Sequence, residues 1–191
     1  SATKAGLLVN AGAYTAVDAA EADREAAFRL NAEGPAALAR ACARHGAAMI
    51  QISTDYVFDG EGGEPWTEED KTAPQNAYGR TKRAGEEKIE KIGGKYFIFR
   101  TSWVFDSVGP NFLVTMLRLG KEREELRVVN DQIGAPTYAP HLAAALVKAL
   151  HKLPPQAGGG ISNTKRPRRY RHERRRHRAA KGTRSAGANT V

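Results

Sequence analysis

The chain has 191 residues, 41% of them hydrophobic and 27% charged, which is enough apolar material for one domain with its own core. No run of about 18 apolar residues occurs, and the first residues lack the charged and apolar regions of a secretory signal. We therefore expect no membrane-spanning helix and a cytoplasmic protein. The single cysteine, Cys42, excludes a disulfide within the chain and has the apolar helical setting of a small core residue.

The positive charge is concentrated at one end of the sequence. Residues 165–191 hold eleven Lys and Arg and one acid, so the net charge of this segment is +10. The rest of the chain has a net charge of −1, which gives +9 for the whole chain. Because residues 158–191 are basic, of low complexity and poor in apolar side chains, we expect a disordered tail there. It could bind nucleic acid non-specifically through phosphates. It could equally be the product of a shifted reading frame in a GC-rich gene.

Strand-like and helix-like segments alternate through residues 1–157, which we expect to form one domain. Short apolar runs predict strands at four places: 6–12, 47–54, 95–105 and 126–130. Amphipathic segments predict helices between and after them: 21–46, 76–94, 111–124 and 138–152. Near-continuous apolar strands alternating with helices are typical of an α/β fold, a doubly wound parallel sheet with helices on both faces.

Polar and aromatic residues follow the predicted strands, where such sheets bind their ligands. Thr54 and Asp55 end the second run, and Trp103 lies near the end of the third. On the next predicted helix, Tyr78 precedes Lys82 by one turn. Because carboxyl ends of parallel strands share one edge of the sheet, we expect Thr54, Tyr78 and Lys82 to converge there.

The pair formed by Tyr78 and Lys82 has the chemistry of a proton donor. A free phenol titrates near ~10, and a fixed ammonium group close by lowers that pKa. Such a phenol can protonate a carbonyl oxygen while a hydride adds to its carbon. Taken singly, each residue also has a structural interpretation: Tyr78 as an amphipathic surface ring, Lys82 as a solvated charge and Thr54 as a turn residue.

Four motifs in this order carry a resemblance: "STDYVFDG", "YGRTK", "FRTSWVF" and "NDQIGAPT". Together they resemble the extended short-chain dehydrogenase/reductases, most closely the subfamily that reduces the C4 ketone of dTDP-4-dehydro-6-deoxy-L-mannose to dTDP-L-rhamnose. The resemblance implies a Rossmann-like fold, NADPH or NADH as cofactor, a nucleotide-sugar substrate and no metal. A homodimer is a further option.

The resemblance also implies roles for individual residues. Thr54, Tyr78 and Lys82 would be catalytic. Tyr78 and Lys82 would also bind the cofactor, together with a loop after the first strand: Ala13, Tyr14 and Thr15. Thr54 would hold the substrate carbonyl oxygen, Asp55 would contact the sugar, and Trp103 would offer a stacking surface.

One family feature is absent from the sequence. No G-x-G-x-x-G or G-x-x-G-x-x-G motif, which would cradle the cofactor pyrophosphate, occurs in the chain. We therefore expect a partial fold that lacks its first βαβ unit, with weak binding of NADPH or NADH and impaired activity. The regulatory beta subunit of methionine adenosyltransferase resembles the same reductases, so a non-catalytic binding role is the alternative.

Overall fold

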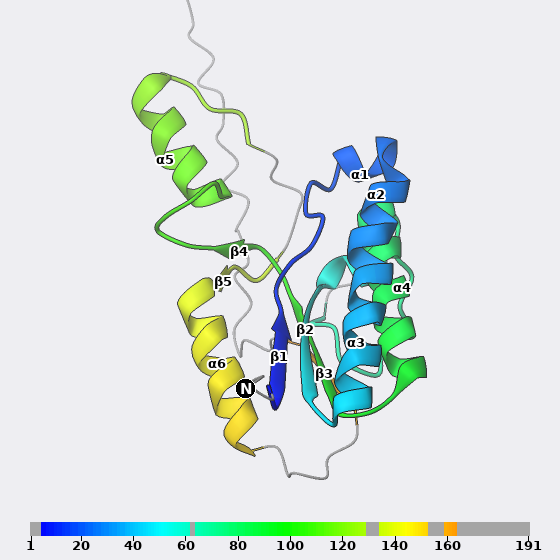
Figure 1. The fold of residues 1–191 in the computed structure, drawn as a ribbon. Coiled ribbons are helices and arrows are strands. Elements are labelled where there is room, and N and C mark those ends of the chain that lie inside the picture. Colours follow the sequence, from blue (N-terminus) through cyan, green and yellow to red (C-terminus); the bar gives the residue numbers. More distant parts are fainter. Residues whose placement is uncertain (1–4, 62–63, 129–133, 153–158, 164–191) are drawn as a thin grey trace, which may run out of the picture.

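The computed structural model describes residues 5–61, 64–128, 134–152 and 159–163. Its centre is a parallel sheet with the strand order β1-β2-β3-β6 (Figure 1). The bounds of its strands are Leu7–Asn10 for β1, Ala48–Thr54 for β2, Tyr96–Thr101 for β3 and Gly160–Asn163 for β6. The α/β class and the parallel sheet predicted from the apolar runs are confirmed.

The fourth strand of this sheet comes from a different segment than predicted. Residues 126–128 form no strand, and 129–130 lie outside the described residues. Instead β6 pairs in parallel with β3, and the backbone N–H of Asn163 donates to Glu68 Oε1 at 2.8 Å. Residues 160–163, expected in the tail, are therefore part of the sheet. The remainder of that tail, 164–191, lies outside the described residues.

Helices cover one side of the sheet most closely. The chain from Ala19 to His45 forms α1 (Ala19–Ala22), α2 (Arg24–Phe28), the π-helix η1 (Arg29–Glu33) and α3 (Gly34–His45). With α4 (Ala77–Ile92), α2 and α3 lie along one side of the sheet, while α6 (Ala139–Lys152) lies on the other (Figure 1). Cys42 is buried in the core between α3, α4 and the sheet, as predicted.

The third predicted strand is interrupted. β3 ends at Thr101, and β4 (Val104–Phe105) leaves the main sheet to pair with β5 (Thr137–Tyr138). Trp103, between β3 and β4, has a left-handed φ of 46°. This value is unusual for a large side chain, because Cβ then crowds the following carbonyl oxygen. Helix α5 (Phe112–Glu122) follows, and the Asn111 side chain caps it by accepting from the Val114 N–H.

Two glycines bring α4 into contact with neighbouring backbone. A Cβ at Gly79 would overlap the carbonyl oxygen of Tyr56, on the short helix η2 (Asp55–Val57) after β2. A Cβ at Gly85 would overlap the carbonyl oxygen of Asn31 on η1. Only residues without a side chain allow these approaches, so α4 is held close to η2 at one point and to η1 at the other.

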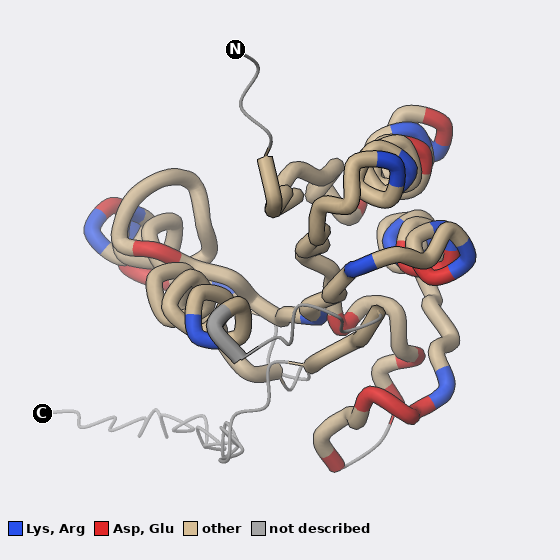
Figure 2. The backbone as a smooth tube through the Cα atoms, turned by 60° about the horizontal axis from the view of Figure 1, so that its bottom comes forward, with Lys and Arg blue, Asp and Glu red and all other residues tan. Residues whose placement is uncertain are grey.

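Acidic and basic residues are interspersed along the helices (Figure 2). Among the described residues, the ion pair between Arg100 and Glu86 is buried. Arg100 on β3 donates to Glu86 on α4 from Nε at 3.0 Å and from a terminal nitrogen at 2.7 Å. Arg83 donates to the same carboxylate at 3.0 Å. Glu86 is 1% exposed, so its charge is compensated by these two guanidinium groups rather than by water.

Replacing Glu86 by Gln should destabilise the fold by about 3 kcal/mol, because it replaces the carboxylate that faces the buried Arg100 by a neutral amide. The matched control is Glu87→Gln, whose ion pair with Arg83 is exposed and should contribute less than about 1 kcal/mol. Urea unfolding of both variants measures the difference. Equal stability losses would show that the buried pair does not hold α4 to β3.

Replacing Gly79 by Ala should cost about 1–3 kcal/mol, because the new methyl group forces α4 away from the Tyr56 carbonyl. Gly120→Ala is the control: Gly120 lies exposed in α5 with its nearest neighbour, Leu126 Cδ1, 4.0 Å from the added Cβ. There the better helix propensity of Ala should leave stability unchanged or raise it by up to about 1 kcal/mol. A neutral Gly79→Ala in thermal unfolding would contradict the close approach.

Candidate active site

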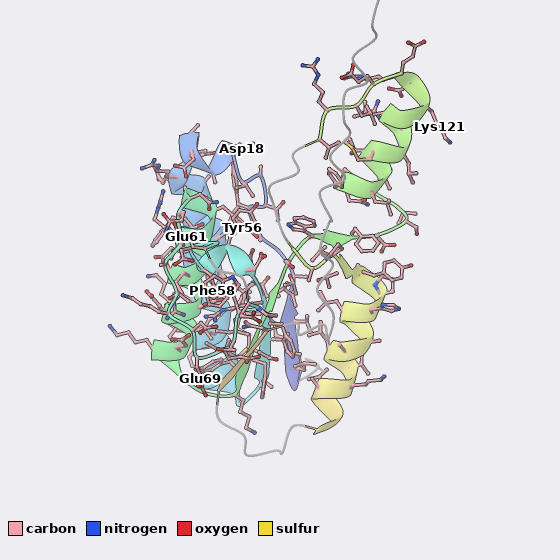
Figure 3. The ribbon with its side chains drawn as sticks, turned by 180° about the vertical axis from the view of Figure 1, so that it is seen from behind. Asp18, Tyr56, Phe58, Glu61, Glu69 and Lys121 are labelled. Carbon is pink, nitrogen blue, oxygen red and sulfur yellow. The ribbon has the colours of Figure 1, made fainter. Side chains whose placement is uncertain are left out.

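The candidate site lies where β2 ends and α4 begins. Thr54 is the last residue of β2, and the chain then turns into η2. Asn76 starts α4, because its Oδ1 accepts from the Gly79 N–H at 2.7 Å. Tyr78 is therefore in the first turn of α4 and Lys82 in the second. Figure 3 shows Tyr56 and Asp18 at this end of the sheet.

Thr54 lies between Asp55 and Tyr78 at the end of β2. The Thr54 hydroxyl donates to Asp55 Oδ1 at 3.2 Å and accepts from the Tyr56 N–H at 3.2 Å. The Thr54 side chain also lies close enough to the Tyr78 phenol to lower its pKa. The Tyr56 ring meets the Tyr78 ring edge-on, with centroids 5.6 Å apart. The structure thus brings together Thr54 and Tyr78, as the sequence predicted.

The acidity of Tyr78 differs from the prediction. Burial raises the pKa of its phenol above 10.0, and the neighbouring Asp55 and Tyr56 add to this, while the nearby Thr54 side chain opposes it. The predicted lowering by Lys82 does not appear, because burial dominates the pKa of the phenol and the charge that acts on it is the Asp55 carboxylate. In this structure Tyr78 is therefore a protonated phenol at neutral pH.

Lys82 is buried beneath the end of β2 rather than solvated. Its side chain is only 4% exposed, and Nζ donates to the carbonyl oxygen of Ile52 at 2.7 Å. Burial lowers the pKa of Lys82 to about 8, although Glu86 raises it. The ammonium is held in place at the sheet edge and remains mostly charged at neutral pH. The interpretation of Lys82 as an ordinary surface charge is wrong for this structure.

Asp55 is also unusual in its titration. Burial raises the pKa of its carboxyl to about 6, against the hydrogen bonds from Thr54 and from the backbone, which lower it. A carboxyl that titrates close to neutral pH beside a phenol and a hydroxyl is characteristic of functional sites.

The loop after β1 reaches the same place through Tyr14. The Tyr14 ring and the Tyr78 ring pack against a cluster of three alanines: Ala20, Ala27 and Ala77. Within this loop Ala13 is half-buried and Thr15 is exposed. Gly12 and Ala13 carry no large side chain, so their backbone can be approached closely. Together with the ammonium of Lys82 and the hydroxyl of Tyr78, this loop places hydrogen-bonding groups at one edge of the sheet.

Sequence reasoning missed Asn31, which fastens this loop. Its Oδ1 accepts from the Tyr14 N–H at 2.9 Å, and its Nδ2 donates to the Tyr14 carbonyl oxygen at 3.1 Å. A single Asn on an otherwise Ala-rich stripe, four residues after Ala27, was the available signal.

Trp103 makes its contacts with residues 134 and 137 rather than with Thr54, Tyr78 or Lys82. Its indole is 39% exposed and lies against Gly134, where a Cβ would overlap the ring. The Trp103 carbonyl oxygen accepts from the Thr137 N–H at 3.1 Å. Its strained φ costs on the order of 1–3 kcal/mol, the kind of strain that gathers at functional sites.

Two other properties concern only the described part of the chain. Within it, no three side chains of His, Cys, Asp or Glu are grouped so that they could hold a metal ion. Nor does any helix described there have the length and apolar character needed to cross a membrane.

Known proteins resemble the chain in sequence. It is 54% identical over 144 residues to the dTDP-4-dehydrorhamnose reductase of Escherichia coli K12, a match that covers 75% of this chain and 48% of that protein. The reductase of the same name from Burkholderia thailandensis is 52% identical over 147 residues, covering 77% and 49%. The chain thus spans about half the length of the curated relatives it matches.

Solved structures of reductases with the same name resemble the chain in fold. The dTDP-4-dehydrorhamnose reductase of Bacillus anthracis, solved in complex with NADP, superimposes with a TM-score of 0.78 at 44% identity, covering 85% of this chain and 57% of that one. The reductase from Clostridium acetobutylicum gives a TM-score of 0.77 at 43% identity, covering 84% and 56%.

The family itself is identified by a family model. The model described as the RmlD substrate binding domain matches residues 1–161, a range that contains Thr54, Tyr78 and Lys82. The predicted resemblance to rhamnose-forming reductases is confirmed: this chain belongs to the RmlD substrate binding domain family.

Proposed function

We propose that this domain serves the NADPH- or NADH-dependent reduction of the C4 ketone of dTDP-4-dehydro-6-deoxy-L-mannose to dTDP-L-rhamnose. The observation that carries the proposal is the contact between the Tyr78 and Thr54 side chains beside the buried ammonium of Lys82. The relatives named above carry the name of this activity. The same observations disfavour the non-catalytic regulatory subunit as an alternative.

In the proposed mechanism Tyr78 is the general acid. Its raised pKa keeps the phenol protonated at neutral pH, so it can release its proton to the carbonyl oxygen as negative charge develops there. The Thr54 hydroxyl holds that oxygen in place. Lys82 lies one turn beyond Tyr78, and its ammonium binds the ribose of the cofactor. A bound NADPH or NADH supplies the hydride.

The remaining residues take supporting roles in the proposal. Asp55 binds the sugar, and the exposed indole of Trp103 stacks on the substrate. The loop residues Ala13, Tyr14 and Thr15 bind the cofactor together with Tyr78 and Lys82. We also propose a cytoplasmic location.

Replacing Tyr78 by Phe should lower the rate of reduction by about 10²–10⁴-fold, because the proton donor is lost while the ring contacts remain. The assay follows NADPH consumption with the 4-keto nucleotide sugar, at NADPH concentrations high enough to offset weak binding. Tyr56→Phe is the control, since it removes the neighbouring hydroxyl but keeps the edge-on ring contact. Equal rates in the wild-type chain and Tyr78→Phe would refute the role of Tyr78.

The raised pKa of Asp55 predicts a pH dependence of stability. The folded chain holds this proton up to about pH 6, whereas the unfolded carboxyl releases it near 3.8. Ionisation of Asp55 therefore lowers the free energy of unfolding as the pH rises from about 4 to about 6.

Asp55→Asn should remove this fall, which urea unfolding at several pH values would measure. Asp59→Asn is the control, because that side chain only accepts from the Glu61 N–H on an exposed loop. An unchanged pH profile in Asp55→Asn would show that Asp55 is not buried at the site.

A further inference from the structure

A glutamate on the short helix α1 contacts the start of α4. Glu21 Oε1 accepts from the backbone N–H of Ala77, the first residue of α4, at 2.5 Å, although 56 residues separate the two in the sequence. A terminal nitrogen of Arg80, also on α4, lies 3.5 Å from the same oxygen. The other carboxylate oxygen accepts from Arg24 on α2 at 2.8 Å. One side chain thus joins α1, α2 and α4.

The first backbone N–H groups of α4 need acceptors from outside the helix, because no earlier turn supplies a carbonyl oxygen for them. Asn76 accepts from the Gly79 N–H, and Glu21 accepts from the Ala77 N–H. A carboxylate suits this place, since the start of a helix carries a partial positive charge. Glu21 therefore caps, from a distant part of the chain, the turn that carries Tyr78.

The ion pairs of Glu21 are a weaker reason for its position. The side chains of Glu21, Arg24 and Arg80 are 41%, 68% and 48% exposed, so water and salt screen both pairs. The hydrogen bond from the Ala77 N–H holds the pKa of Glu21 below its usual 4.5 and has a larger effect than either arginine. The contact with the start of α4 is thus the interaction that most favours the charged carboxylate.

Apolar packing brings α1 to the same turn of α4. Ala20, next to Glu21, is fully buried in the alanine cluster that includes Ala77, and the Tyr78 ring packs against this cluster. The turn therefore meets α1 through both an apolar side chain and a carboxylate. Gly79, in the same turn, lies against the backbone of η2. Two separate elements, α1 and η2, hold the start of α4.

We propose that Glu21 is a positioning residue that fixes the first turn of α4, and with it the Tyr78 side chain, relative to the end of β2. That Tyr78 donates a proton rests on the function proposed above. A proton donor must lie within hydrogen-bonding reach of the atom that it protonates, so a small displacement lowers the rate of that step. Glu21 acts through the Ala77 backbone and takes no part in the reaction itself.

Three variants of the 191-residue chain test this. Glu21→Ala removes both the acceptor and the charge. Glu21→Gln keeps a carbonyl oxygen that can accept from the Ala77 N–H, and it is the conservative variant. Glu25→Ala is the matched control, because Glu25 is an exposed acid in the first turn of the neighbouring helix α2.

Three measurements are made on each variant. Hydrogen exchange of the Ala77 amide reports the cap, and it should accelerate by about tenfold or more in Glu21→Ala, since hydrogen bonds to charged groups are among the stronger ones. The NMR signals of the Tyr78 ring report its position and should shift in Glu21→Ala. In the reductase assay, kcat should fall severalfold in Glu21→Ala while KM changes less. Glu21→Gln should largely restore all three values, and Glu25→Ala should leave them unchanged.

The outcomes separate this proposal from the proposed function. Unchanged exchange at Ala77 in Glu21→Ala overturns the cap. Faster exchange with unshifted Tyr78 ring signals overturns the positioning role, because the carboxylate then stabilises only the end of the helix. Equal effects in Glu21→Gln and Glu21→Ala also overturn it, since the acceptor then makes no difference. If exchange and ring signals respond as expected but the wild-type chain reduces no substrate, Glu21 does position Tyr78, and it is the proposed reaction that fails.

Discussion

The site depends on how closely α4 lies against two stretches of backbone. At Gly79 the helix meets the Tyr56 carbonyl, and at Gly85 it meets the Asn31 carbonyl. The first contact brings the first turn of α4 beside the end of β2, which is why the side chains of Tyr78 and Thr54 lie close together. The second contact holds η1, and through it the loop after β1. A shift of α4 would therefore disturb both halves of the site together.

The inward face of α4 is polar for much of its length, and its three buried polar side chains Thr81, Lys82 and Glu86 each have a partner on a neighbouring element. Lys82 donates to the β2 backbone, Thr81 accepts from Asn31, and Glu86 binds Arg100 on β3. Such contacts are directional, whereas apolar contacts would allow the helix to slide or rotate. Their energetic benefit is modest because desolvation offsets it. Their consequence here is a defined rotation of α4, with Tyr78 turned toward Thr54.

Much of this arrangement could be predicted from the sequence, because apolar runs indicate strands and glycines at the ends of amphipathic segments indicate where helices end. The first three strands, the helix around Tyr78 and the convergence of Tyr78 with Thr54 follow from such signals and from motif order. β6 could not be predicted in this way, since its four residues have little apolar character and are ordered by pairing with β3. Asn31 was missed because its partners are distant in sequence. The sign of the Tyr78 pKa shift was wrong because burial and Asp55 outweigh a charge one helical turn away.

The central claim is that Tyr78 is a buried, protonated phenol held against Thr54 and Asp55. The most direct test is a titration of Tyr78 by NMR in ring-labelled protein, with Tyr78→Phe used to assign its signal. The account predicts that Tyr78 titrates above its ordinary pKa of 10.0 and that Asp55→Asn lowers this value. A Tyr78 that titrates at or below 10.0, with no response to Asp55→Asn, would contradict it.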